Sequence, residues 1–387
     1  MSNETIGNYT IYKNYKSKLG KGAYSSVYKG QYLGVTNEYL FNGTMVAIKI
    51  INTSSLSYGD YEITNNEVKI MNMLKLKPHP NIVKCLDTIQ TQKHTYIIME
   101  LCECGDLLSI MNKPIEEKFV RAYFSQLISG LKFLHGHKLI HRDIKPKNIL
   151  LSNNKKILKI ADFGFAKIIN TSLLKDKICG SPLYMAPEIM NNDIYNDQAD
   201  LWSVGIILYE MIYGAHPYKH CKSFGELKEE INVTTIKIPP DDINIKVSNE
   251  CITILKKLLQ KPLNLRISWL EFFDNNWTNA ANIDDVNFDE MLDSDDRIVN
   301  SYSPNYINVK TGGIDIPRSN TPNSYESSRS TPDNGMKIMN SNINIIEDYY
   351  SIENNSPVVK ITNYVTDSYI FDMDFGDELK YVKHNIT

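Results

Sequence analysis

Short apolar stretches mark the first hundred positions of this chain of 387 residues. Ile11, Leu19 and Val27 stand among short polar alternations, which predict two strands joined by a turn at 20–25. Continuous apolar runs at 46–48 and 96–99 predict further strands, the second of them buried.

Apolar residues at helical spacing mark the following stretches. Val68 and Met71 share one face of a predicted helix that also carries Glu67. Beyond Pro114 the apolar positions recur every three or four residues, at Phe119, Tyr123, Leu127, Leu131 and Leu134. Another apolar helix is predicted from Asp200 to Tyr213, and short strands are predicted at 149–150 and 158–160.

Two polar strings interrupt this pattern: His-Arg-Asp-Ile-Lys-Pro-Lys-Asn-Ile-Leu at 141–150 and Asp-Phe-Gly at 162–164. Phosphoryl transfer requires a group that orients the attacking hydroxyl, oxygen ligands for Mg²⁺ and cations for the phosphates. The four residues that can supply these functions are Asp143 for the hydroxyl proton, Asn148 and Asp162 for two Mg²⁺ ions, and Lys145 for the transferring phosphate. The strings therefore predict a phosphoryl-transfer centre.

These strings resemble those of the eukaryotic protein kinases. A lysine two residues after the aspartate, here Lys145, is typical of the serine/threonine kinases. The resemblance implies an α+β fold of two lobes, a small antiparallel β lobe with one helix and a larger, mainly helical lobe. It also implies transfer of the γ-phosphate of ATP to Ser or Thr of protein substrates. His141 is then expected to pack beneath Asp-Phe-Gly, not to act as a base.

The resemblance also implies a nucleotide site. Lys49 would bind phosphate with Glu67 as its counter-charge, although Glu62 lies on the same helix. The glycine-rich turn is incomplete, because Ser25 stands where a third glycine is usual. The residues expected at the nucleotide are Leu19, Gly20, Lys21, Gly22, Ala23, Tyr24, Ser25, Ser26, Val27, Ala47, Lys49, Glu100, Cys102, Asp106 and Leu150.

Within that site each contact has an expected partner on the nucleotide. The Glu100 carbonyl and the Cys102 amide would bind adenine, and Asp106 would reach the ribose. The side chains expected to sandwich the adenine ring are those of Val27, Ala47 and Leu150.

The string at 179–188, Cys-Gly-Ser-Pro-Leu-Tyr-Met-Ala-Pro-Glu, is similar to that of the autophagy-initiating serine/threonine kinases. The resemblance implies that its first part, 179–185, forms a peptide-docking ledge. The resemblance pairs Glu188 with Arg266 and directs Asp200 to amides of the catalytic loop. Two interpretations of the activation segment remain: either Thr171 or Ser172 is phosphorylated, or Lys177 makes phosphate unnecessary.

The substrate peptide can be predicted from one position in the catalytic loop. Kinases that select arginine upstream of the target residue commonly carry an acid where Lys147 stands, and a lysine would repel such peptides. We therefore expect targets with apolar neighbours.

Composition narrows the class of protein. With 42% hydrophobic and 22% charged residues and a net charge of −3, the chain has no basic excess to indicate nucleic-acid binding. No apolar run is long enough to span a membrane. Six cysteines without a paired spacing favour a reducing, cytoplasmic setting.

The sequence predicts three regions: a kinase domain at 9–277, an acidic and Ser/Asn/Pro-rich flexible linker at 278–340, and a tail at 341–387. In the tail, Tyr349 and Ile352 resemble an acidic aromatic-x-x-aliphatic motif that binds ubiquitin-like modifiers. Two alternatives to an active protein kinase stay open, a pseudokinase scaffold and a small-molecule phosphotransferase. The intact catalytic set argues against the first, and the Ala-Pro-Glu segment at 186–188 argues against the second.

Overall fold

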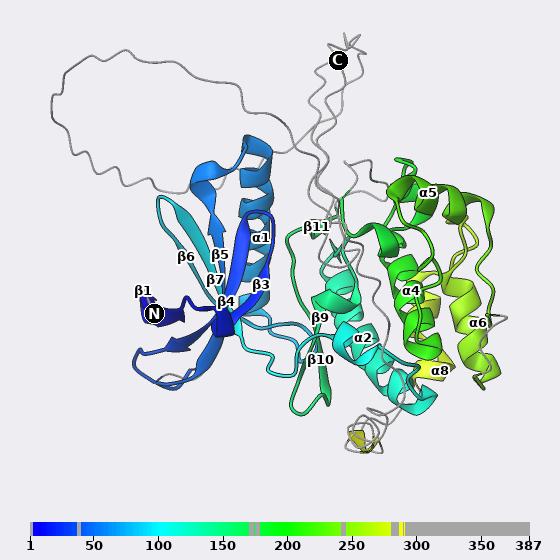
Figure 1. Cartoon of the computed structure of the whole chain (residues 1–387), viewed down its shortest axis with the longest axis horizontal. Coiled ribbons are helices and arrows are strands. Elements are labelled where there is room, and N and C mark those ends of the chain that lie inside the picture. Colours follow the sequence, from blue (N-terminus) through cyan, green and yellow to red (C-terminus); the bar gives the residue numbers. More distant parts are fainter. Residues whose placement is uncertain are drawn as a thin grey trace, which may run out of the picture. The chain divides into compact units, whose positions relative to one another are not determined.

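A computed structural model describes residues 3–36, 40–169, 174, 179–240, 245–279, 286–288 and 290. All of them belong to one compact unit, and the second unit, 299–367, lies outside the described residues. Figure 1 shows a lobe built around a β-sheet and a lobe that is mainly helical. The two-lobed α+β fold expected from the sequence is confirmed.

The first lobe contains an antiparallel sheet with the strand order β1-β2-β4-β5-β7-β6, in which β3 also pairs with β4. Its strands are β1 (Asn3–Ile6), β2 (Tyr9–Tyr12), β3 (Lys18–Lys21), β4 (Ser25–Tyr32), β5 (Met45–Asn52), β6 (Cys85–Gln90) and β7 (His94–Glu100). The region predicted as two strands thus holds three, and β1 begins before them.

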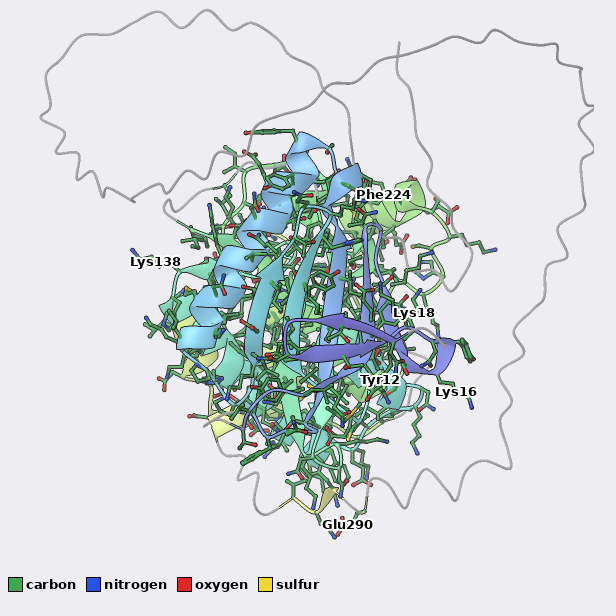
Figure 2. The ribbon with its side chains drawn as sticks, turned by 90° about the vertical axis from the view of Figure 1, so that its left-hand side faces the viewer. Tyr12, Lys16, Lys18, Lys138, Phe224 and Glu290 are labelled. Atoms are coloured by element: carbon green, nitrogen blue, oxygen red, sulfur yellow. The ribbon has the colours of Figure 1, made fainter. Side chains whose placement is uncertain are left out.

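Alternation along β5 divides the sheet into two faces. Val46, Ile48 and Ile50 point into a cluster that Tyr9 and Ile11 of β2 cover, whereas Ile51 packs with the core beneath helix α1 (Tyr58–Leu76). Because side chains alternate with a period of two, Lys49 lies on the face of Ile51. Figure 2 shows α1 lying along the strands on this face.

The second lobe contains the remaining α-helices and two short strand pairs. Its helices are α2 (Glu117–Gly136), α3 (Pro187–Met190), α4 (Ala199–Tyr213), α5 (Phe224–Val233), α6 (Asn249–Leu258), α7 (Trp269–Phe273) and α8 (Asn276–Asn279). Its strands are β8 (Leu139–Ile140), β9 (Ile149–Ser152), β10 (Ile157–Ile160) and β11 (Lys167–Ile168), paired as β9 with β10 and β8 with β11.

Single-turn 3-10 helices fill several of the connections. They are η1 (Tyr15–Ser17), η2 (Thr53–Ser55), η3 (Leu107–Ile110), η4 (Pro146–Asn148) and η5 (Pro182–Tyr184).

Helix α4 is the centre of the second lobe, because every residue from Ala199 to Tyr213 is buried. A helix that is apolar on all sides needs partners on all sides. It contacts α2, α6 and the 3-10 turn η5. The polar residues within it therefore face fixed neighbours, and the first of these is Asp200.

Candidate active site

Lys49 joins the two lobes. Its Nζ lies 2.6 Å from Oε1 of Glu67 on α1 and 2.8 Å from Oδ1 of Asp162, which follows β10. The predicted partner Glu67 is therefore confirmed, and Glu62 is exposed elsewhere on the same helix. One strand, one helix and one loop thus converge on a single ammonium group.

Burial and charge act in opposite directions within this cluster. Burial alone would lower the pKa of Lys49, but the carboxylates of Asp162 and Glu67 raise it above its ordinary value. The Lys49 charge lowers the pKa of Asp162 to about 2. Burial raises the pKa of Glu67, and Lys49 opposes that rise. Asp162 therefore carries the firmest negative charge, the form that a metal ion binds.

Asp143 lies in a fixed position between strands β8 and β9. Its Oδ2 accepts hydrogen bonds from Asn148 Nδ2 at 2.8 Å and Lys145 Nζ at 3.1 Å, and its Oδ1 accepts the Ser181 amide at 2.9 Å. Lys145 Nζ also donates to Ser181 Oγ at 2.6 Å. The structure thus brings together three of the residues predicted for transfer, Asp143, Lys145 and Asn148.

The loop that carries Asp143 is held by two buried side chains. Asp200 accepts the amides of His141 at 2.8 Å and Arg142 at 2.9 Å, as predicted. His141 donates from Nε2 to the Ala161 carbonyl, accepts the Asp143 amide at Nδ1, and packs 5.1 Å from the Phe163 ring. Its structural role beneath Asp-Phe-Gly is therefore confirmed.

Two backbone conformations bring the catalytic loop and the activation segment together. Arg142 has φ of +64° and Gly180 has φ of +99°. A Cβ at Gly180 would lie 2.5 Å from the Arg142 carbonyl oxygen, so only glycine allows this approach. The Ser181 amide that bonds Asp143 depends on the same approach.

The predicted nucleotide residues lie on three neighbouring segments. The turn after β3 closes through a hydrogen bond from the Gly22 amide to the Ser25 carbonyl. Val27 pairs across the sheet with Lys49, and Ala47 pairs with Met99. The residues of the turn and its flanks are Leu19, Gly20, Lys21, Gly22, Ala23, Tyr24, Ser25 and Ser26.

The segment after β7 connects the lobes and is tied to β9. The Cys104 amide donates to the Leu151 carbonyl, and Leu150 forms a bridge with Asp106. Glu100 accepts Lys159 Nζ at 2.9 Å with its side chain. Burial raises the pKa of the neighbouring Cys102 to about 12, so its thiol stays protonated. Asp106 caps η3 by accepting the Ser109 amide.

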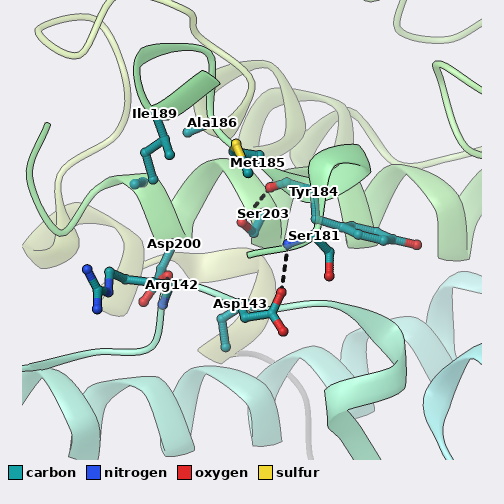
Figure 3. Close-up of a pocket in the computed structure, with 11 residues that line it drawn as sticks. Arg142, Asp143, Ser181, Tyr184, Met185, Ala186, Ile189, Asp200 and Ser203 are labelled. Carbon is teal, nitrogen blue, oxygen red and sulfur yellow. Dashed lines mark hydrogen bonds between the residues drawn. The ribbon is translucent and has the colours of Figure 1, made fainter. Parts of the chain in front are cut away.

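A ledge formed by residues 179–185 rests on α4. Ser203 Oγ donates to the Tyr184 carbonyl at 2.6 Å. The bond lies beside a cavity of about 10 Å³ that Asp143 and Asp200 also line, and Figure 3 shows these residues. Tyr184 Oη donates to the buried Glu210 at 2.8 Å. Two hydrogen bonds between Tyr184 and side chains of α4 therefore hold the ledge in one arrangement.

The comparison with protein families agrees with this arrangement, because the family described as "Protein kinase domain" matches residues 13–278. The chain belongs to the protein kinase family. The predicted Glu188–Arg266 pair of the kinase fold is present, with Arg266 Nη1 at 2.6 Å and Nη2 at 2.9 Å from the two carboxylate oxygens.

Known relatives are serine/threonine kinases by name. The chain is 39% identical to serine/threonine-protein kinase atg1 of Dictyostelium discoideum over 72% of this chain and 40% of that protein. It is 40% identical to serine/threonine-protein kinase ULK3 of Xenopus laevis over 66% of this chain and 53% of that protein. It is 36% identical to a putative serine/threonine-protein kinase of Acanthamoeba polyphaga mimivirus over 69% of this chain and 63% of that protein. The chain thus spans about half the length of these relatives.

Membership of the kinase family implies the use of ATP and a divalent metal ion. The side-chain oxygens of Asn148 and Asp162 are donors that fit Mg²⁺. This ion takes one or two protein oxygens and completes its coordination shell with water and phosphate. Asn148 donates both bonds from Nδ2 to Asp143, leaving Oδ1 as its acceptor. In the described part of the chain no group of three or more His, Cys, Asp or Glu could hold a metal alone.

Two residues that shape the kinase site could not be predicted from the sequence. Tyr195 accepts a hydrogen bond from Arg142 at 3.3 Å, and Glu210 anchors Tyr184 from 26 positions away. Neither residue stands in a motif, so only the fold reveals them.

Some predictions fall outside the described residues. Thr171, Ser172 and Lys177 of the activation segment lie there, as do Tyr349 and Ile352. The helices of the described kinase lobes include none with the length and apolarity to cross a membrane.

Proposed function

We propose that this kinase transfers the γ-phosphate of Mg-ATP to Ser and Thr hydroxyls of protein substrates. The observation that carries the proposal is the position of Lys49, which contacts Glu67 and Asp162 at once. A pseudokinase scaffold would not need a buried ammonium held between two carboxylates, because such a charge is expensive to bury.

Asp143 would accept the proton of the incoming hydroxyl. A carboxylate offers about four acceptor sites, and Asn148, Lys145 and the Ser181 amide occupy three of them. One site is left for a substrate hydroxyl, and its direction is fixed by the other three bonds. This preorganisation supports general-base orientation without movement of the side chain.

ATP would lie between the turn at 20–25 and the segment around Cys102. Lys49 would bind its phosphates, and Asn148 and Asp162 would hold two Mg²⁺ ions, which neutralise the charge on the transferring group. The Glu100 carbonyl and Cys102 amide would bind adenine. The side chains proposed to enclose the ring and the ribose are those of Leu19, Val27, Ala47, Leu150 and Asp106.

The substrate peptide would lie on the ledge at 179–185. Lys147 is exposed, beside the transfer residues in the same loop, and its charge supports selection against upstream arginine. A positional peptide library would test this: we expect no enrichment of arginine before the target residue, and strong arginine selection there would contradict it.

We extend the proposal to the whole chain. The kinase domain would occupy 9–277, and the tail would recruit partners, with Tyr349 and Ile352 binding a ubiquitin-like modifier through strand addition. Tyr349→Ala with Ile352→Ala should abolish capture of that partner in a pull-down, whereas a pair that binds as well as the wild type would remove the tail proposal and leave the catalytic one intact.

The enzymatic proposal is tested by incubating the full chain with labelled ATP, Mg²⁺ and a generic protein substrate. Acid hydrolysis of the product should yield phosphoserine and phosphothreonine. The control is Asp143→Asn, in which the base is replaced by a side chain of the same shape. The proposal would be contradicted if the label were found on tyrosine alone. It would also be contradicted if the wild type and Asp143→Asn transferred equal amounts of label.

A further inference from the structure

The chain returns to helix α2 after the last helix of the kinase domain. Phe288 is 2% exposed, and its ring centroid lies 6.0 Å from that of Phe119 and 5.2 Å from that of Tyr123. Residues 286–288 and 290 fall in the region predicted as linker, beyond the match to the kinase family. An aromatic anchor therefore fixes the chain to the face of α2 at this point.

Glu290 sets the direction in which the chain continues. Its Oε2 lies 2.6 Å from Nζ of Lys118, at the start of α2, and both side chains are about half exposed. Such a pair contributes little free energy, but it brings the backbone close to the N-terminal turn of α2. Figure 2 shows Glu290 at the lower edge of the molecule.

Lys118 also lines an open groove beside α2. The groove has a volume of about 310 Å³, its apolar wall comes from Ile115, Ile212, Ile245 and Val247, and Lys118 and Lys246 stand among its lining residues. We call it the α2 groove. Its volume is large enough for two medium-sized apolar side chains.

The walls of the α2 groove are held together by Glu117. This carboxylate accepts Ser248 Oγ at 2.5 Å, the Ser248 amide at 2.8 Å and Trp277 Nε1 at 2.7 Å. Helix α2, the start of α6 and helix α8 are thus bonded to one side chain. The groove is a preformed feature, so an occupant would not have to create it.

We propose that the α2 groove is the seat of this chain's own residues Met291 and Leu292. They follow Glu290 directly, at the point where Glu290 contacts a residue of the groove. Phe288, Met291 and Leu292 have the spacing i, i+3 and i+4 in the sequence, at which three side chains would share one face of a helical segment. The buried position of Phe288 assigns that face to α2.

Charge does not decide the occupant, because Lys118 and Lys246 stand beside Glu116 and Glu117 in the lining of the groove. The assignment of Met291 and Leu292 therefore rests on the buried ring of Phe288 and on the contact between Glu290 and Lys118.

Cross-linking tests the seat directly in the full chain. Val247→Cys with Leu292→Cys, treated with a short bismaleimide, should give an intramolecular cross-link that peptide mapping separates from products of the six native cysteines. The matched control, Val247→Cys with Met339→Cys, places the second thiol in the distant tail, and we expect at least about a tenfold lower yield. Equal yields in the two proteins, or a cross-link only between two chains, would overturn the proposal.

Hydrogen exchange provides a second readout that needs no added thiol. Met291→Ser with Leu292→Ser should speed amide exchange at 116–119 and 246–248 and lower the melting temperature by about 2–4 °C. The control pair Ile338→Ser with Met339→Ser removes similar apolar side chains elsewhere in the tail and should change neither. Unchanged exchange in the first variant would contradict the seat even if the protein stays fully folded.

Discussion

Lys49 and Glu67 approach to 2.6 Å, which ties strand β5 to helix α1 across the buried face of the sheet. The same ammonium lies 2.8 Å from Asp162 in the other lobe. A shift of α1 by one turn, about 5 Å, would break the first contact. The position of α1 therefore determines whether Glu67 can hold the Lys49 ammonium beside Asp162.

Glu67→Gln should lower kcat/KM at least about tenfold, a loss of about 1.4 kcal/mol of transition-state stabilisation. The amide keeps the size of the side chain but removes the charge that fixes Lys49. Steady-state kinetics with a peptide substrate would measure it. Glu62→Gln on the same helix is the control, because Glu62 is exposed and makes no contact with Lys49. Equal losses in the two variants would show that the ion pair has no special role.

Glu188→Gln should destabilise the folded protein by about 3–5 kcal/mol, because it leaves the guanidinium of Arg266 buried without its counter-charge. Arg266 has no exposed side-chain surface and stacks 5.4 Å from the ring of Trp202. Urea unfolding followed by tryptophan fluorescence would measure the change.

The matched control for that variant is Glu271→Gln, which removes the exposed partner of Lys257. A solvent-exposed pair contributes about 0–1 kcal/mol, so this variant should stay close to the wild type. If both variants lost the same small amount of stability, the buried pair would not be a fixed point of the fold.

Stability should fall as the solution becomes more acidic, partly through His216. Burial lowers the pKa of His216 to about 4 from an ordinary value of 6.5, although the Leu183 carbonyl opposes the shift. Between these values the unfolded chain binds a proton that the folded protein excludes. The contribution is therefore complete above about pH 6.5 and is lost as the pH falls towards 4, by roughly 3 kcal/mol.

The measurement is the free energy of unfolding at several pH values between 7 and 4. His216→Gln should reduce the slope of that curve, because the variant has no group at this position to titrate. His220→Gln removes an exposed histidine and should retain the full effect of His216. A slope that is the same in wild type and His216→Gln would refute the assignment.

The sequence predicted the parts of this site whose spacing is short. Asp143, Lys145 and Asn148 stand within six positions of one another, so a single loop determines their relation. Lys49 could be paired with Glu67 because the helical pattern placed Glu67 beside the buried face. These contacts follow from local periodicity together with the resemblance to kinases.

Other contacts could not be predicted because they depend on packing between distant segments. The bond between Tyr184 and Glu210 requires that η5 rests on α4, and no motif records this. Strand β1 was not predicted because it has only four residues and is partly exposed. It forms by antiparallel pairing with β2, which the local pattern of residues 3–6 does not indicate. Phe288 lies in an acidic stretch with low apolar density, so its burial against α2 was hidden.

The most direct test of the account is phosphate transfer by Asp162→Asn. This change keeps the shape of the side chain and removes the charge that Lys49 holds and that Mg²⁺ would bind. The rate of transfer from labelled Mg-ATP to a generic protein should fall more than about a hundredfold, at least about 3 kcal/mol. Asp193→Asn, at an exposed position, is the control and should keep the wild-type rate. Unchanged turnover in Asp162→Asn would contradict the proposed role of this carboxylate and, with it, the phosphoryl-transfer site.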